Sequence, residues 1–278
     1  MLKVALTHDI DRIDKTYQYF THAAKGLFMF DFKSAAYHMS SAFNKHNSYW
    51  GFDEMIAIEQ KYGVKSTCYF LNESIKVNPF DIYNWKLSLG RYDIHDPRIV
   101  QIIKWLDNNG WDIGVHGSYN SYLHPDLLKK EKAIMEKIVG HELIGIRQHY
   151  LNISSQTWAW QKQAGFKYDS SFGLTDSIGF KENKIKTFRP FNDYFAVIPM
   201  VIMDYPFVVL KDPMPKLNNL IDICIQNNSL LCINWHNNYF TEKEFPLHKK
   251  SYIMIIEECL KRNARFYTMR DYYAEILL

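Results

Sequence analysis

Leu2-Lys3-Val4-Ala5-Leu6-Thr7 is an apolar run that continues directly into His8-Asp9-Ile10-Asp11. Four of the five residues from Leu2 to Leu6 are apolar, and this predicts a buried strand. Asp9 and Asp11 come where that strand should end. In α/β enzymes, acidic residues at the carboxyl end of a strand can place a general base beside a metal ligand. The opening residues therefore predict an α/β enzyme with its site at the strand ends.

The composition favours one soluble domain. The chain has 278 residues, 47% of them hydrophobic, so we expect a single domain over residues 1–278. A net charge of +3 without a long basic run argues against nucleic-acid binding. We see no signal segment and no apolar stretch near the ~20 residues of a membrane span. We therefore expect a cytoplasmic location without integral membrane association. The composition does not predict an oligomeric state.

The four cysteines are scattered and form no CxxC pair, so we expect buried free thiols.

Helical and strand patterns alternate along the chain. The predicted strands are residues 2–7, 64–71, 111–115, 142–146, 166–168, 196–203, 230–235 and 265–268. The predicted helices are residues 54–62, 156–164, 216–227 and 250–262, two more that begin at Pro97 and Pro125, and a short closing helix. This alternation predicts an α/β fold: a single-domain, distorted (β/α) barrel of about seven parallel strands. Residues 12–50 and 73–96 interrupt the alternation, and we expect loop insertions there that wall a binding cleft.

Ionisable residues recur where the predicted strands end. They are Asp9 and Asp11 after the first strand, His116, Arg147 with His149, Asp204, and His236. The carboxyl ends of parallel strands meet at one mouth of a barrel, so these side chains should lie together. Packing alone does not account for polar groups at five strand ends.

The motifs taken in order resemble those of the polysaccharide deacetylases, the family 4 carbohydrate esterases. The resemblance extends from about Leu2 to Met269. It is carried by Thr7-His8-Asp9-Ile10-Asp11, Tyr62-Gly63-Val64-Lys65-Ser66-Thr67-Cys68-Tyr69-Phe70, Asn109-Gly110-Trp111-Asp112-Ile113-Gly114-Val115-His116, Gly145-Ile146-Arg147-Gln148-His149-Tyr150, Asp204 and Ile233-Asn234-Trp235-His236.

The resemblance implies a metal-dependent hydrolase that removes an N-acetyl group from a saccharide or glycan precursor. The implied catalytic residues are Asp9 as base, Arg147 as its partner, His236 as general acid and Asp204, which would orient His236. Asp11 and His116 would bind one divalent ion. An Asp and histidine set suits Zn²⁺ first, and it also accepts Co²⁺, Ni²⁺ or Fe²⁺.

The sequence departs from the family pattern at two motifs. Ile10 separates acids that are usually adjacent, so the roles of Asp9 and Asp11 could be exchanged. Asn120 stands where a second metal-binding histidine is usual, and an amide oxygen is a poor zinc ligand. We expect His149 to replace it, with His124 as the alternative. Loss of the metal, and with it of activity, is the opposing interpretation.

The expected substrate contacts come from residues that flank the motifs. Tyr150 and Trp235 are candidates for stacking on a sugar, with Phe172 and Tyr239 as further aromatic candidates, and Asn120 is a candidate polar contact. Aromatic residues beside a motif belong to the core at least as often. A different substrate, such as a non-sugar amide or formamide, and a catalytically silent carbohydrate-binding barrel are the competing functions.

Overall fold

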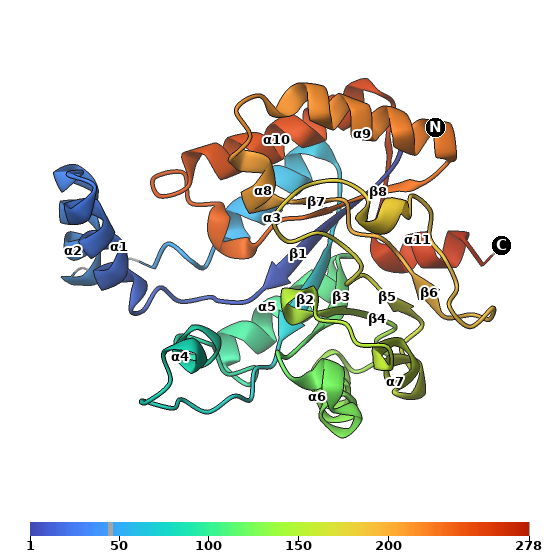
Figure 1. Cartoon of the computed structure of the whole chain (residues 1–278), viewed down its shortest axis with the longest axis horizontal. Helices are drawn as coiled ribbons and strands as arrows, with labels where there is room; N and C mark the ends of the chain where they lie inside the picture. Colours follow the sequence, from blue (N-terminus) through green and yellow to red (C-terminus); the bar gives the residue numbers. More distant parts are fainter. Residues whose placement is uncertain (44–46, 278) are drawn as a thin grey trace.

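A parallel sheet forms the centre of the molecule (Figure 1). The computed structural model describes residues 1–43 and 47–277. The strands are β1 Lys3–Ile10, β2 Thr67–Leu71, β3 Asp112–Gly117, β4 Gly145–Gln148, β5 Tyr168–Asp169, β6 Ala196–Val197, β7 Ile202–Met203, β8 Leu230–Asn234 and β9 Arg265–Tyr267. Their order is β6-β5-β4-β3-β2-β1-β8-β7, and β9 also pairs with β1.

β1 lies in the middle of the sheet. Its residues are buried on both faces, as a central parallel strand requires. It pairs with β2 through Asp9 opposite Tyr69, and with β8 through Thr7 opposite Asn234. Alternate side chains point to opposite faces. Asp9 therefore faces the same side as Thr7, whereas His8 faces the surrounding helices and lies 2.7 Å from Glu59 of α3 (Phe52–Tyr62).

The two ends of the sheet are bridged by one segment of chain. We predicted a single strand at residues 196–203, and this is wrong: it is two short strands, β6 and β7, at opposite ends of the sheet. The intervening residues bond to both ends, since Ile198 N donates to Asp169 O of β5 and Val201 N donates to Cys232 O of β8, each at 2.9 Å. The predicted distorted barrel is thus confirmed, with closure by a connecting segment that contains Pro199 instead of a continuous strand.

The helices surround this sheet. Besides α3 they are α5 Pro97–Asn108, α6 Pro125–Val139, α7 Thr157–Gln163, α8 Asp204–Val208, α9 Pro213–Asn227, α10 Pro246–Lys261 and α11 Met269–Glu275. All four cysteines are buried and free, as expected. Within the described part of the chain, no helix is both long and apolar enough to cross a membrane.

Both predicted insertions contain helices that the sequence did not reveal. α1 (Gln18–Phe28) and α2 (Phe32–Phe43) form a hairpin after β1, and α4 (Ile82–Ser88) lies in the second insertion. The hairpin projects away from the barrel in Figure 1. Its helices carry large apolar residues that face solvent, so the usual pattern of an apolar face against the core does not identify them.

Candidate active site

A pocket of about 280 Å³ lies at the carboxyl ends of the strands. Its lining residues are Asp9, Asp11, His116, His149, Tyr150, Leu151, Thr175, Met203 and His236. The parallel sheet therefore brings together the ionisable side chains that the sequence placed at separate strand ends.

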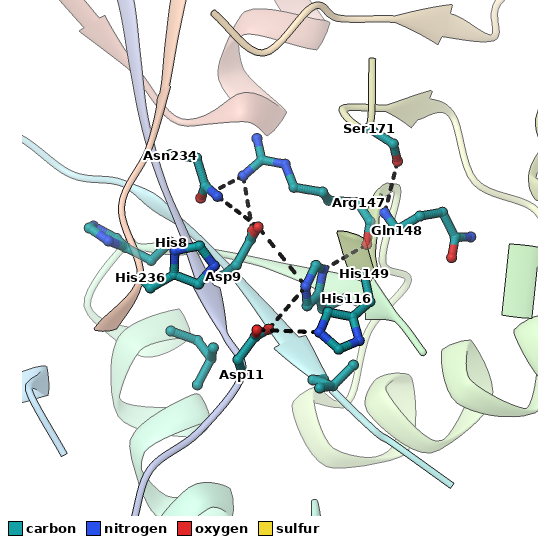
Figure 2. Close-up of polar contacts among 12 residues, drawn as sticks. His8, Asp9, Asp11, His116, Arg147, Gln148, His149, Ser171, Asn234 and His236 are labelled. Carbon is teal, nitrogen blue, oxygen red and sulfur yellow. Dashed lines mark hydrogen bonds and ion pairs between the residues drawn. The ribbon is translucent and has the colours of Figure 1, made fainter. Parts of the chain in front are cut away.

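Asp11 lies between two imidazoles. Its Oδ1 is 3.2 Å from His116 Nε2, and its Oδ2 is 3.3 Å from His149 Nε2. One ligand atom from each of the three residues lies within 4.8 Å of the others. Figure 2 shows this group on one side of Asp9, and Arg147 with Asn234 on the other.

The polar atoms of this group fit a divalent ion. Oδ1 of Asp11 is buried and has no hydrogen-bond partner among the described residues. Nδ1 of His116 lies 2.8 Å from the Arg147 carbonyl, which can only accept, so this nitrogen carries the proton and Nε2 keeps its lone pair for a metal. Two imidazole nitrogens and a carboxylate oxygen are a usual zinc-binding set. The residues present thus suit the ion that the motifs imply.

His149 lies beside two charged residues that sequence analysis missed. Its Nδ1 lies 3.7 Å from Glu73 Oε2, and its Nε2 lies 3.1 Å from Nη2 of Arg91. The Arg91 guanidinium only donates and so requires a lone pair on Nε2, whereas the Asp11 carboxylate, 3.3 Å from the same nitrogen, only accepts. Glu73 and Arg91 both come from the insertion at 73–96, where no motif marked them. The expectation that this insertion walls the cleft was the one signal that pointed there.

Asp9 is held on its other side by Arg147 and Asn234. Arg147 Nη1 donates to Asp9 Oδ1 at 3.0 Å, and Asn234 Nδ2 donates to Asp9 Oδ2 at 2.7 Å. Arg147 Nη1 also donates to Thr7 Oγ1 and to Asn234 Oδ1. Burial acts to raise the pKa of Asp9, but the positive charge of Arg147 above all, with that of His236, outweighs it and lowers that pKa. Asp9 is therefore an ionised, rigidly oriented carboxylate.

His236 and Asp204 form a second acid–imidazole pair across the pocket. Oδ2 of Asp204 lies 2.7 Å from His236 Nδ1 and accepts the backbone N–H of His236 at the same distance. Burial acts to lower the pKa of His236, but Asp204 dominates and raises it to about 10. The imidazole is thus a protonated donor at neutral pH, with its side chain 21% exposed at the pocket.

The expected substrate contacts are only partly at the pocket. Tyr150 lines it and is 51% exposed, at a backbone φ of 56° that is uncommon for a bulky residue. Trp235 is 0% exposed and packs in the core against Tyr252, so its indole cannot stack on a sugar there. Asn120 is exposed and is absent from the described residues that line the pocket.

The alternative ligand and the remaining histidine of the first motif also lie elsewhere. His124 is exposed and precedes α6, outside the described metal-type groups. His8 is fully buried behind the sheet, as its alternation with Asp9 predicts.

A second group of side chains that could bind a metal instead surrounds the ammonium group of Lys15. His22, His38 and Glu244 lie together. However, Lys15 Nζ is 2.6 Å from Glu244 Oε1 and 2.8 Å from His38 Nδ1. The ammonium occupies the position a metal ion would need, so we interpret this group as a clasp between the hairpin and the barrel.

The fold and the pocket define a barrel of the α/β class with two acid–histidine pairs at its mouth. No family model and no curated protein matches the chain. A structure from Mycobacterium smegmatis assigned as a polysaccharide deacetylase has 15% identity and a TM-score of 0.59, covering 99% of this chain and 89% of the other. A structure from Pseudomonas aeruginosa PAO1 with the same assignment has 11% identity and a TM-score of 0.61, covering 98% and 90%.

The Puue allantoinase has the same fold, with 12% identity, a TM-score of 0.60, and coverage of 98% of this chain and 89% of the other. At these identities the likeness concerns the fold. The chain therefore has the polysaccharide deacetylase fold that its motifs predicted.

Proposed function

We propose that the chain is a metal-dependent hydrolase that removes an N-acetyl group from a saccharide or glycan precursor. The observation that carries this proposal is the arrangement around one pocket: a metal-type group, an arginine-held carboxylate and a protonated histidine. Amide hydrolysis needs these three functions, because water must be activated, the carbonyl polarised and the amine protonated as it leaves. We also propose a cytoplasmic location.

Asp11, His116 and His149 would hold the divalent ion, with Zn²⁺ as the first candidate. When bound, such an ion polarises a carbonyl oxygen and makes a water molecule more acidic. Asp9 takes the proton of the attacking water, and Arg147 with Asn234 keeps the carboxylate ionised and aimed.

His236 then gives a proton to the departing amine, while Asp204 fixes the orientation of the imidazole. The carbon–nitrogen bond breaks, the water oxygen stays on the acetyl carbon, and acetate and a free amino sugar are the products. Tyr150, half-exposed at the rim, is the aromatic surface that we propose for the sugar ring.

The test is metal content together with acetate release, measured on the same samples of wild type, His116→Ala, His149→Ala and two controls. The controls are His124→Ala and Asn120→Ala, because both side chains lie outside the described ligand group. We expect wild type to hold about one metal ion per chain, and the two ligand variants to lose both metal and activity. A wild type that binds no divalent ion supplied in excess would leave the silent carbohydrate-binding barrel as the better account.

The fold is shared with an allantoinase, so it does not by itself select a saccharide. Assays on N-acetylglucosamine oligomers, acetamide and allantoin separate the proposed function from hydrolysis of a non-sugar amide. Activity confined to the last two compounds would contradict the saccharide proposal.

A further inference from the structure

The α1–α2 hairpin exposes an unusual concentration of large apolar side chains. They are Phe20, Leu27, Phe28, Met29, Phe30, Phe32, Met39 and Phe43, with exposed fractions between 38% and 83%. Scattered single apolar residues are normal on a protein surface, but a contiguous group of this kind marks an interaction site.

The spacing of the six residues that lie on the helices places them on one face of the hairpin. On α1 the apolar positions Phe20, Leu27 and Phe28 follow helical spacing, and on α2 so do Phe32, Met39 and Phe43. The residues buried between the helices include Ala23 on α1 and Ala35 on α2. Viewed down each helix axis, the exposed apolar stripe is rotated from these buried residues in the same direction and by a similar angle. Two antiparallel helices are related by an approximate two-fold axis through the hairpin, so equal offsets bring both stripes to one side.

The polar side of the hairpin is already occupied. His38 and His22 lie there, and Lys15 ties His38 to Glu244 of the barrel. Glu244 also accepts from Tyr37 at 3.2 Å. The apolar face therefore points away from this clasp, and it has no counterpart within the described residues of the chain.

The tip of the hairpin uses a bulky residue where the backbone favours glycine. Phe30 has a φ of 57° and is 82% exposed, between Met29 and Asp31. A turn alone would be made more cheaply with Gly or Asn, because a positive φ strains a bulky residue. Exposing a phenylalanine side chain to water is unfavourable and does not offset the strain. The choice of residue therefore indicates that the tip enters an apolar medium.

The charged residues beside the tip indicate which apolar medium it enters. Lys25 on α1 and Lys33 on α2 are exposed on either side of the turn, and Asp31 is the sole acid from residue 18 to residue 43. The Asp31 carboxylate is engaged by the backbone N–H of Ser34 at 2.9 Å. A convex apolar tip with a lysine on each flank matches the acyl region and the anionic head groups of a lipid bilayer.

We infer that the α1–α2 hairpin docks this protein on the surface of a bilayer that contains anionic lipid. The apolar face enters the boundary between head groups and acyl chains, and the two lysines remain at the phosphates. α1 begins shortly after Asp11, so a docked hairpin holds the pocket near the lipid surface. On the proposed function, this favours a saccharide carried on a membrane lipid as the substrate.

The direct test is flotation with vesicles of phosphatidylcholine alone or mixed with phosphatidylglycerol. The variant is Phe28→Gln/Phe30→Asn/Phe32→Gln. Its control, Val209→Gln/Leu247→Gln/Leu260→Gln, replaces exposed apolar residues outside the hairpin. We expect wild type and control to float with the mixed vesicles, and the hairpin variant to lose at least about tenfold in partitioning. Lys25→Gln/Lys33→Gln should lose about fivefold per charge, on the anionic vesicles alone.

Wild type that stays unbound with both vesicles, or a hairpin variant that floats equally well, would overturn the inference. So would a concentration-dependent dimer in sedimentation velocity that the hairpin variant abolishes without any vesicle binding, since a second copy would then be the occupant.

Acetate release separates this inference from the proposed function. On a water-soluble N-acetyl saccharide, the hairpin variant should equal wild type. On an N-acetylglucosamine glycolipid within vesicles, it should lose activity in proportion to its lost binding. Vesicle binding without acetate release from either substrate would refute the enzyme and leave the docking surface standing.

Discussion

Asp9 and Asp11 stand two residues apart, yet their surroundings give them different chemistry. Asp9 is held by Arg147 and Asn234, whereas Asp11 faces the two imidazoles. These contacts favour Asp9 as the base and Asp11 as the ligand over the exchanged assignment that the sequence left open.

Asp9→Asn should reduce acetate release by about 10²–10⁴-fold, because the amide cannot accept the water proton. Metal content should stay near that of wild type, since Asp11, His116 and His149 are unchanged. Asp126→Asn, an exposed position at the start of α6, serves as the matched control. If Asp9→Asn instead lost its metal, and its activity fell only as far as its metal content, the assignments of Asp9 and Asp11 would be exchanged.

The pH dependence should report the Asp204–His236 pair. The protonated form of His236 is the proposed general acid, and its pKa is raised to about 10, so we expect activity to fall as the pH rises through that value. Asp204→Asn removes the charge that raises the pKa. The alkaline limb of the rate profile should therefore move down by about two units, while the acid limb changes little. An unmoved alkaline limb would show that another group sets it.

The same pair contributes to folding stability with a defined sign. A raised folded-state pKa means that the contribution is complete below the unfolded value near 6.5 and is lost as the pH rises towards about 10. Chemical unfolding of wild type and Asp204→Asn at several pH values checks this. Their difference should be largest at low pH within that window.

Much of the candidate site could be predicted from the ionisable residues at strand ends. The direction of individual side chains, and partners distant in the sequence, could not be predicted from the motifs. Trp235 shows the first problem, because Asn234 and His236 reach the pocket side and alternation turns the residue between them into the core. Glu73 and Arg91 show the second. They come from an insertion whose path no local pattern fixes.

At the scale of elements, α3 is fixed to the sheet by a buried polar cluster. Glu59 accepts hydrogen bonds from Ser66 Oγ, Trp111 Nε1 and Tyr252 Oη, and it lies 2.7 Å from His8 Nε2. A buried carboxylate requires this many partners, and each partner in turn loses its acceptor if the acid is removed.

Glu59→Ala should therefore lower the free energy of unfolding by about 3–5 kcal/mol. Glu54→Ala, on the exposed side of the same helix, removes a carboxylate that pairs with Lys249 and should change stability by less than about 1 kcal/mol. Urea unfolding of both variants is the measurement. Equal effects would mean that helix propensity, and not the buried cluster, dominates at these positions.

The elements also show what a sequence can predict. Long apolar runs identified β1, β2, β3 and β8 because parallel strands are buried on both faces. The run at residues 196–203 looked like another such strand, but burial there comes from crossing between the two sheet ends. Local hydropathy does not distinguish these cases.

At the scale of the molecule, the barrel interior is filled by large aromatic side chains opposite very small residues. Tyr69 and Tyr168 are fully buried, and Gly114 and Gly145 lie against them. A Cβ at Gly145 would come within 2.1 Å of the Tyr168 ring. The sequence showed the glycines, but only the strand register reveals which tyrosine each one accommodates.

Gly145→Ala should consequently destabilise the protein by about 1–3 kcal/mol. The double variant Gly145→Ala/Tyr168→Leu should lose less than the sum of its parts, because the shortened side chain relieves the overlap. Thermal and urea unfolding of the four-member cycle checks the coupling. Strict additivity would show that the two residues do not compete for the same space.

The central place of β1 also governs how a nascent chain completes this sheet. β1 is translated before its partners β8 and β9, which span residues 230–234 and 265–267. The edge of this apolar strand that pairs with β8 thus stays without its native neighbour until residues 230–234 have left the ribosome. Contacts of such long sequence separation form slowly, and open strand edges aggregate. Chaperone binding to ribosome-held chains should persist until β8 has emerged.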